Sequence, residues 1–470
     1  MVGIDDLAFY VPELFLEIET LAQARDLPLE KLRYGLGLEK MAIPYPDEDA
    51  ATMAAEAVWQ LIQRNQLDPR NIGRIYLGTE SAWDGAKPMA SYTLEMLENR
   101  LSATYGVRCL QNCDVVDLTF ACIGAVDALQ NTLDWAAAKS DRIGIVVAAD
   151  YAKYELGSGG EYTQGAGAVA LLVRQNPRLL ALDTDWGVAT HSVHDFHKPK
   201  RRATKEQIIQ EVLTLAELDH LSAAQLTQKL YALNGSAGEI LGGATPYLHL
   251  FKETPLFDGQ FSNQCYQDRI KEAFEHFKKQ HPNFKLSNWK RIALHLPYAK
   301  HGERVFQQIF AGQQDEFGQA LQDELQMPFT DTPEYYRAVA KSKTYKTYSQ
   351  SVILPGSLAS AQIGNMYTAS IFMALISLLD DLSRQGAAQE GDTIGFIAYG
   401  SGSKAKVFAG VLQPNWQKVA ASLQIMEYLQ NQRKAIGYQT YLDYHEDQKP
   451  VRRNRPFTLQ TIDAGQRIYQ

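Results

Sequence analysis

The sequence is poor in cysteine and carries no excess of positive charge. Four cysteines in 470 residues do not make the disulfide framework of a small secreted domain, and the formal net charge is −8. This negative balance argues against a general nucleic-acid or anionic-membrane binder. No apolar run reaches the ~20 residues of a membrane span, and the acidic start Met1–Pro12 lacks the segments of a signal peptide. We expect a protein of a reducing compartment, the cytoplasm, with neither nucleic acid nor membrane as partner.

The sequence also lacks the spacing of a zinc site. Cys109 and Cys113 have no second ligand pair to complete such a site. His191, His194 and His197 would offer an alternative metal site if a strand placed them on one face, but no carboxylate or cysteine accompanies them. We therefore predict no bound metal.

The chain is long enough for one large domain or two fused ones, and it contains an internal echo. With 45% hydrophobic and 21% charged residues it is globular. Two apolar strands in the first third of the chain resemble two strands in the last third. In both regions an apolar helix precedes the second strand. The strands are Ile72–Glu80 and Asp141–Asp150, echoed by Trp289–Pro297 and Asp392–Ser401, and the helices are Ala121–Ala138 and Tyr367–Asp381. Chance similarity is the alternative to a duplicated α/β unit with mostly parallel sheets covered by helices.

Cys122 stands where a strand region turns into a helix. Ile123, Val126, Leu129 and Leu133 follow it at helical spacing. A sulfur at a helix N-terminus meets unpaired N–H groups and the positive end of the helix dipole, which favour a thiolate. The alternative is a buried cysteine that acts as a small apolar side chain.

If the duplication is real, Glu80, Cys122, His295 and Asn365 lie at the ends of corresponding elements, where open α/β sheets form ligand crevices. A cysteine can carry an acyl group as a thioester, a carboxylate can remove a proton beside its carbonyl, and a histidine can polarise a second carbonyl. Together these groups would form a carbon–carbon bond. The alternatives are a helix-capping acid at Glu80 and a hydrogen-bonded core histidine at His295.

Two glycine-rich loops accompany these residues. Leu156–Val173 lacks the lysine and hydroxyl ending of a P-loop, so we expect it to allow close approach to a substrate or a partner subunit. Tyr399–Ser403 follows a strand, and its free backbone N–H groups would form an oxyanion hole with the N–H of Cys122. An ordinary strand-to-turn glycine pair is the alternative for the second loop.

Taken together, the motifs resemble those of the 3-hydroxy-3-methylglutaryl-CoA synthase family, which are condensing enzymes of the thiolase-like superfamily. The resemblance covers nearly the whole chain. Its matching segments are Gly35–Met41, Thr79–Ala82, Ala121–Gly124, Ser158–Ala170, His194–Pro199, Phe257–Gly259, His295–Lys300, Gly364–Thr368 and Tyr399–Gly402.

The resemblance implies a role for each site residue. Cys122 would be acetylated by acetyl-CoA, Glu80 would remove a methyl proton, and His295 would orient and assist the ketone of acetoacetyl-CoA. Hydrolysis would then release 3-hydroxy-3-methylglutaryl-CoA, the precursor of the mevalonate route to isoprenoids, and no cofactor would be needed. A homodimer is implied as well. The implied substrate-binding residues are Tyr154, Gly160, Thr163, His197, Lys300 on the CoA side, Asn365, Tyr367 and Ser401.

The implied architecture is an α/β thiolase-like fold of two similar halves in α-β-α-β-α layers. We expect an N-terminal half over 1–180, a C-terminal half over 181–413 and an extension over 414–470. An inserted helical segment over about 200–254, with helices Glu206–Leu218 and Ser222–Leu233 and a glycine-rich turn Gly235–Gly243, would lie near the active-site mouth. Ala420–His445 is predicted helical and Arg452–Arg455 a solvated surface.

Two departures and two rival functions accompany the resemblance. Phe120 stands where similar enzymes have a polar residue and Ile123 where they have tyrosine, so the acyl preference is open to change. A synthase of the same type that adds a carbon branch to a polyketide on an acyl carrier protein would use the same three catalytic residues. A non-catalytic thiolase-like protein is the third hypothesis, and the intact Cys122, Glu80 and His295 count against it.

Overall fold

A ten-stranded mixed sheet forms the centre of the fold. The computed structural model describes residues 1–218, 220–232, 245–250, 253–446, 451, 453–463 and 465–470. Along the sheet the strands are β14 (Trp289–Leu294), β15 (Thr393–Gly400), β16 (Lys404–Leu412), β8 (Leu180–Leu182), β1 (Val2–Tyr10), β7 (Gly165–Gln175), β6 (Ile143–Ala152), β4 (Ile72–Gly78) and β5 (Asp114–Leu118), while β9 (Gly187–Thr190) pairs with β16.

The two halves of the sheet repeat one pattern. In the first half β4 and β6 are parallel and β6 is antiparallel to β7; in the second half β14 and β15 are parallel and β15 is antiparallel to β16. The strands matched by the sequence echo therefore occupy corresponding places, which agrees with two similar α/β halves. Strand β8 joins the halves, because it pairs with β1 on one side and β16 on the other.

The prediction of mostly parallel sheets is wrong. Within the described strands of the large sheet, parallel pairing is confined to β14 with β15 and to β4 with β5 and β6, and the other pairs of this sheet are antiparallel. Helices cross over between the parallel strands, whereas β15 and β16 are joined by a turn of only three residues, which permits antiparallel pairing alone.

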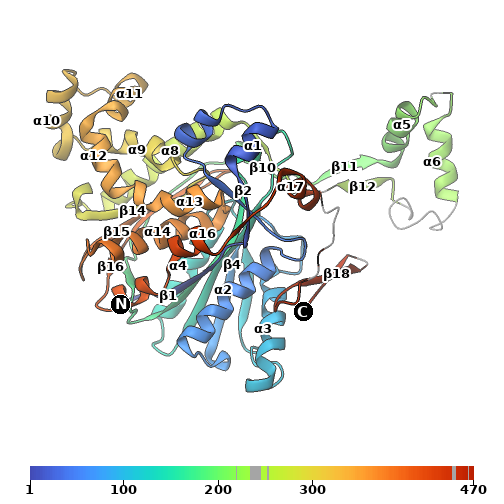
Figure 1. The fold of residues 1–470 in the computed structure, drawn as a ribbon, viewed down its shortest axis with the longest axis horizontal. Helices are drawn as coiled ribbons and strands as arrows, with labels where there is room; N and C mark the ends of the chain where they lie inside the picture. Colours follow the sequence, from blue (N-terminus) through green and yellow to red (C-terminus); the bar gives the residue numbers. More distant parts are fainter. Residues whose placement is uncertain (219, 233–244, 251–252, 447–450, 452, 464) are drawn as a thin grey trace. The chain divides into compact units, whose positions relative to one another are not determined.

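Helices cover both faces of the strands. Alternate residues of β7 point to opposite sides: Ala168 and Ala170 join the core beneath helix α2 (Ala50–Asn65), whereas Val169 and Leu171 join the core that contains helix α4 (Gly124–Ala137). Helix α3 (Met89–Tyr105) lies beside α2 (Figure 1). In the second half α14 (Ser370–Gln385) and α8 (Gly259–Gln280) pack on the strands, and α14 shares one core cluster with α4. This is the predicted thiolase-like layering.

Shorter elements surround these layers. A three-stranded sheet combines β2 (Leu14–Glu17), β3 (Lys40–Ile43) and β17 (Lys434–Ala435). Outside the segment Phe196–Phe257 and before residue 414, the other described helices are α1 (Ile18–Ala24), α9 (His301–Ala311), α10 (Gln314–Leu325), α11 (Pro333–Lys341), α12 (Lys343–Val352) and α13 (Leu358–Ile363). The short helical turns are η1 (Lys31–Leu36), η2 (Pro69–Asn71), η3 (Glu161–Thr163), η4 (Leu286–Asn288), η5 (Leu354–Ser357) and η6 (Tyr367–Ala369).

The C-terminal region differs from its prediction. The expected helical segment Ala420–His445 is divided into α15 (Trp416–Ala421), α16 (Ile425–Asn431), β17 and α17 (Tyr438–His445), and a hairpin of β18 (Leu459–Asp463) and β19 (Gln466–Tyr469) follows. Gln424 at φ +46 separates α15 from α16, and pairing of Lys434 with Leu14 turns the next residues into a strand.

The expectation of a solvated basic surface is also wrong for Arg453. Its Nε lies 2.7 Å from Asp47 Oδ1 and its Nη1 lies 3.1 Å from Glu48 Oε1, with 14% of its side chain exposed. The arginine therefore ties the C-terminal region to the segment that precedes α2.

Residues Phe196–Phe257 form a compact unit of their own. It contains β10 (Phe196–His197) paired with β13 (Leu256–Phe257), β11 (Arg201–Thr204) paired with β12 (Tyr247–Leu250), and the helices α5 (Lys205–Leu215) and α6 (Ala223–Ala232). The two predicted helices are confirmed, and Thr204 begins α5 with a capping box. The predicted glycine-rich turn lies outside the described residues. The placement of this unit near the active-site mouth stays a prediction, as do the domain boundaries near 180 and 413.

We expect Gly78→Ala to lower the free energy of unfolding by about 2–3 kcal/mol, the range for an overpacked core. A Cβ at Gly78 would lie 2.1 Å from the backbone N of Ala125, so β4 and α4 would have to separate. Urea unfolding measures the change. Gly159→Ala is the control because nothing lies within 4 Å of its added Cβ, and equal stability of the two variants would contradict the prediction.

Candidate active site

Cys122 lies in the turn between β5 and α4, two residues before the helix begins. Ala121 holds the left-handed conformation at φ +41, and Phe120 and Cys122 form an isolated bridge. Gly400 at the end of β15 comes close to this turn, since a Cβ there would lie 2.6 Å from the carbonyl oxygen of Phe120. The second half of the chain therefore supports the turn that presents Cys122, which is 8% exposed.

Glu80 lies directly beside the thiol. The Sγ of Cys122 donates a hydrogen bond of 2.9 Å to Oε1 of Glu80. Glu80 follows the end of β4 and lies nine positions before α3 begins at Met89, so it does not cap the next helix of the chain. A carboxylate in this position can accept the thiol proton and can also reach a group bound to the sulfur.

Asp150 anchors the turn that carries Glu80, and the sequence did not reveal this role. Its Oδ1 accepts the backbone N–H of Glu80 at 2.7 Å and the hydroxyls of Thr79 and Ser81, both at 2.9 Å. Its Oδ2 accepts the N–H of Thr368 at 3.0 Å and its hydroxyl at 2.6 Å. The only sequence signal was an acidic residue at the end of an apolar strand. The carboxylate is fully buried and links the two halves.

His295 follows β14 and extends its pairing with β15, because its N–H donates to the carbonyl of Ile397 at 3.1 Å. Its carbonyl accepts the hydroxyl of Tyr266 from α8 at 2.8 Å. Burial lowers the pKa of His295 to about 3, so its ring is neutral near pH 7. A neutral imidazole can donate a hydrogen bond to a carbonyl oxygen without carrying a charge.

Tyrosines connect His295 and Cys122. The ring centroids of Tyr266 and His295 are 6.1 Å apart, and those of Tyr266 and Tyr399 are 4.3 Å apart. Burial raises the pKa of Tyr266, and the nearby Cys122 adds to the effect. Tyr266 therefore lies beside His295 and within electrostatic range of Cys122.

Tyr154 and Tyr367 lie beside the same pair. Burial raises the pKa values of both tyrosines, and the charges of Cys122 and Glu80 add to the effect. Their ring centroids are 6.3 Å apart. Gly160 makes room for one of them, since a Cβ there would lie 2.2 Å from the ring of Tyr154.

Asn365 holds the second tyrosine in place. Its N–H donates to the carbonyl of Thr163 at 2.8 Å, and its Oδ1 accepts the N–H of Tyr367, which has φ +41. A Cβ at Gly165 would lie 2.7 Å from the carbonyl oxygen of Asn365. The close approach predicted for the first glycine-rich loop is therefore to this chain itself at Gly160 and Gly165.

The contacts of three further predicted site residues are as follows. Lys300 precedes α9, and its Nζ donates to the carbonyl of Tyr34 at 2.9 Å, next to the first motif segment. Ser401 lies in the turn between β15 and β16 and forms a side-chain hydrogen bond with Tyr399. His197 pairs with Leu256 within the unit Phe196–Phe257.

The turn after β15 does not offer all the free N–H groups that were predicted. The N–H of Gly402 donates to Oδ1 of Asp195 at 2.7 Å, and that of Ser403 donates to the carbonyl of His191 at 2.6 Å. Asp195 is fully buried and also accepts the hydroxyl of Tyr399 at 2.8 Å. This aspartate shapes the turn and was missed in the sequence, so Gly402 and Ser403 are excluded as oxyanion donors.

The alternative metal site lacks its predicted basis. Strand β9 ends at Thr190, before His191, and His197 lies in β10, so the three histidines do not share a strand. Among the described residues no group of three or more His, Cys, Asp or Glu side chains could hold a metal ion.

None of the described helices combines the length and the apolar character that a membrane span requires.

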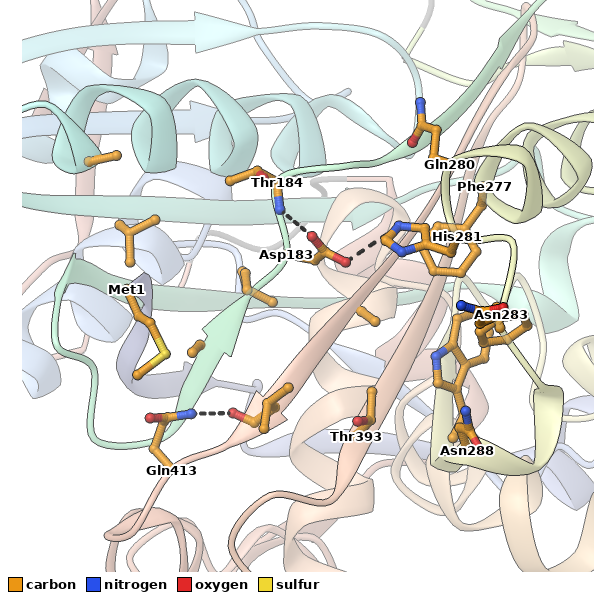
Figure 2. Close-up of a pocket in the computed structure, with 18 of the residues that line it drawn as sticks. Met1, Asp183, Thr184, Phe277, Gln280, His281, Asn283, Asn288, Thr393 and Gln413 are labelled. Carbon is orange, nitrogen blue, oxygen red and sulfur yellow. Dashed lines mark hydrogen bonds and ion pairs between the residues drawn. The ribbon is translucent and has the colours of Figure 1, made fainter.

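A cavity of about 970 Å³ lies at the end of β14 and β15 that is opposite to His295. Its lining includes Trp289 and Thr393, the first residues of β14 and β15, whereas His295 follows the other end of β14. Figure 2 shows Asp183 between Thr184 and His281 in this cavity, and Asp183 Oδ2 lies 3.4 Å from His281 Nε2. The cavity is therefore separate from the site of Cys122.

We expect two buried histidines to make the fold sensitive to acid. Burial lowers the pKa values of His295 and His301 to about 3, below the ordinary value of 6.5, and the charge of Arg304 contributes at His301. The unfolded chain binds protons that the folded chain excludes, so stability is lost as the pH falls below 6.5. Each histidine then costs about 1.4 kcal/mol at pH 5.5.

Replacement of one ring tests this. His301→Phe fits an aromatic ring between Tyr266 and Tyr298, whose centroids lie 4.7 and 4.8 Å from that of His301. Urea unfolding at pH 7.5 and 5.5 should show an acid-induced loss smaller by about 1.4 kcal/mol in the variant than in the wild type. Equal losses would contradict the assignment of a neutral buried ring.

Comparisons with known proteins agree with this site. The N-terminal model of the hydroxymethylglutaryl-coenzyme A synthase family matches residues 1–177, and the C-terminal model matches residues 246–462. The hydroxymethylglutaryl-CoA synthase of Enterococcus faecalis is 29% identical over 416 residues, which cover 88% of this chain and 84% of that protein.

Solved structures share the fold. MvaS in complex with 3-hydroxy-3-methylglutaryl coenzyme A has a TM-score of 0.77 and 27% identity, covering 100% of this chain and 98% of its own. The HMG synthase of the curacin biosynthetic pathway, in complex with holo donor-ACP, has a TM-score of 0.70 at 21% identity and covers 94% and 88%. The chain belongs to the hydroxymethylglutaryl-coenzyme A synthase family.

Proposed function

We propose that this protein condenses acetyl-CoA with acetoacetyl-CoA to 3-hydroxy-3-methylglutaryl-CoA, the reaction that feeds the mevalonate route to isoprenoids. The observation that carries the proposal is the 2.9 Å contact between the Cys122 sulfur and the Glu80 carboxylate. Family membership and the complex of MvaS with the product support the choice of substrates.

In the first step the sulfur of Cys122 attacks the carbonyl of acetyl-CoA. The bond to the CoA sulfur breaks, and the thiol proton passes through Glu80 to the departing CoA thiolate, so that acetyl-Cys122, free CoA and an ionised Glu80 result. The oxygen of the tetrahedral intermediate needs hydrogen-bond donors, for which the N–H of Cys122 and that of Ser401 are the proposed pair. The acetyl methyl group then projects from a sulfur that Glu80 already contacts.

In the second step Glu80 takes a proton from that methyl group. The resulting carbanion attacks the ketone of acetoacetyl-CoA, while His295 donates a hydrogen bond to the ketone oxygen as a neutral ring. The alkoxide that forms takes up the proton held by Glu80, which returns the carboxylate to its ionised form. Water then hydrolyses the thioester to Cys122 and releases the product. These residues perform every proton transfer, so we propose that the reaction needs no cofactor.

Tyr154, Gly160, Thr163, Asn365 and Tyr367 are proposed to form the acyl pocket, since the tyrosines lie beside Cys122 and Glu80 and the others position them. The CoA-side role of Lys300 and the substrate contact of His197 rest on the motif resemblance. A cytoplasmic location is part of the same proposal and is supported by four free cysteines.

We expect wild-type protein incubated with acetyl-CoA to carry one acetyl group on Cys122, detected by mass spectrometry. Acetoacetyl-CoA should then discharge it and yield the product. Cys122→Ala should show neither step, whereas Cys109→Ala, which removes another buried cysteine, should retain both. Glu80→Gln should take up the acetyl group more slowly but reach the wild-type content, and should then condense at least 100-fold more slowly, since removal of a positioned base costs about 10²–10⁴ in rate.

The same assay decides between the rival functions. Discharge by an acetoacetylated carrier protein and not by acetoacetyl-CoA would favour a polyketide-branching synthase, the activity suggested by the curacin-pathway structure. Wild-type protein that takes no acetyl group would favour a non-catalytic role and would contradict the proposed function.

A homodimer is the proposed quaternary state. β5 forms one edge of the large sheet and pairs with β4 alone among the described strands. Val115, Val116 and Leu118 remain partly exposed on it. An unguarded edge strand of this kind is a ready partner for another copy.

Light scattering should therefore give twice the mass of one chain for the wild type and the mass of one chain for Val116→Lys, because a charge on an edge strand opposes pairing. Val411→Lys, in an exposed position of β16, is the matched control and should stay dimeric. A monomeric wild type would contradict the homodimer, and a dimeric Val116→Lys would exclude this edge.

A further inference from the structure

The loop that carries Glu80 runs from β4 to α3 and is bound at both ends. Residues 79–81 bind Asp150, and residues 81–88 contain no helix or strand before α3 begins at Met89. Asp84–Lys87 are exposed, but Asp84 Oδ1 accepts the N–H groups of Ala86 and Lys87, and Lys87 Nζ donates to Ser91 Oγ at 2.9 Å. Trp83 lies between these two sets of bonds.

The C-terminal hairpin supplies a further anchor at Trp83. The guanidinium of Arg467 lies 4.0 Å from the centroid of the Trp83 ring, within the range of a strong cation–π contact. Tyr92 of α3 meets Trp83 edge to face at 6.4 Å and meets Tyr469 at 5.7 Å. The ring of Trp83 therefore lies among residues from α3 and β19.

Asp49 fixes the hairpin to the body of the protein. Its Oδ1 accepts the N–H groups of Ala51 and Thr52 and so caps α2. Its Oδ2 accepts Arg467 at 3.1 Å and the hydroxyl of Tyr469 at 2.8 Å. Only 17% of the arginine side chain and 12% of the aspartate side chain are exposed, so the pair is shielded from solvent far more than a surface ion pair.

We propose that the hairpin β18–β19 positions the Glu80 loop for proton removal, with Arg467 as the positioning residue that joins Trp83 to Asp49. The inference rests on the proposed function, because it concerns the step in which Glu80 acts. A base displaced by about 1 Å loses a large part of its rate, whereas the equilibrium between acetyl-CoA and acetyl-Cys122 does not depend on where the base lies.

The two half-reactions separate this role from a general loss of structure. Each variant is first saturated with acetyl-CoA, the acetyl-Cys122 content is measured by mass spectrometry, and the acetylated enzyme is then mixed with acetoacetyl-CoA in a single turnover. Arg467→Ala should keep the wild-type acetyl content and the wild-type KM for acetoacetyl-CoA, and should condense about tenfold more slowly. Arg467→Lys should restore most of the rate, because a lysine keeps the charge near Asp49 and Trp83.

Arg174→Ala is the matched control. Arg174 pairs with the buried Asp5 at 2.7 Å, and its side chain is 35% exposed. Val173, its neighbour in β7, pairs with Gly144 of β6, and Gly144 pairs with Arg74 near the start of β4. Arg174 therefore lies at the end of β4 that is opposite to Glu80. This variant should condense at the wild-type rate even if its unfolding midpoint falls.

Tyr469→Phe keeps the ring beside Tyr92 and removes one bond to Asp49, so it tests the anchor even if Arg467→Ala does not fold. It should slow condensation by a smaller factor with full acetylation. The inference is overturned if Arg467→Ala and Tyr469→Phe condense within twofold of the wild type, or if acetyl content falls in proportion to the rate. Absence of acetylation in the wild type would instead contradict the proposed function.

Discussion

The site depends on one buried carboxylate, that of Asp150. Five donors from both halves of the chain converge on it: the N–H of Glu80, the hydroxyls of Thr79 and Ser81, and the N–H and hydroxyl of Thr368. Hydrogen bonds to a charged group each contribute about 1.5–3 kcal/mol, and an unpaired buried charge is strongly destabilising. The turn that carries Glu80 and the turn that follows Asn365 are therefore held in one fixed relation, on which the contact with Cys122 depends.

Exclusion of water determines how the groups around that contact behave. His295 is neutral because burial removes the solvent that would stabilise its charge, and burial also raises the pKa values of Tyr154, Tyr266 and Tyr367. In such surroundings the hydrogen bond between Cys122 and Glu80 is stronger than it would be in water. A dry pocket also protects a thioester until its acceptor arrives. Burial thus strengthens the hydrogen bonds of the site and keeps water from the proposed thioester until its acceptor arrives.

The sequence was informative where a motif is local. Strand ends, the strand-to-helix turn at Cys122 and the amphipathic helices α5 and α6 follow from patterns within a few residues, and the structure has them where they were expected. The roles of Asp150 and Asp195 were missed because their bonds join residues 69 to 218 and 67 to 207 positions apart, which no local pattern records. The strand directions were misjudged because periodicity distinguishes a buried strand but not its pairing partner.

The two residues that flank Cys122 and depart from the family pattern, Phe120 and Ile123, also make contacts that the local sequence does not reveal. Ile123 departs from the family pattern, but it is fully buried, and its Cγ2 would lie 2.7 Å from a Cβ added at Gly400. It therefore fills the space beside β15. The ring of Phe120 lies 4.1 Å from the ammonium of Lys404, which also pairs with Asp127 in the first turn of α4. Both departures thus concern how the turn of Cys122 packs against the second half.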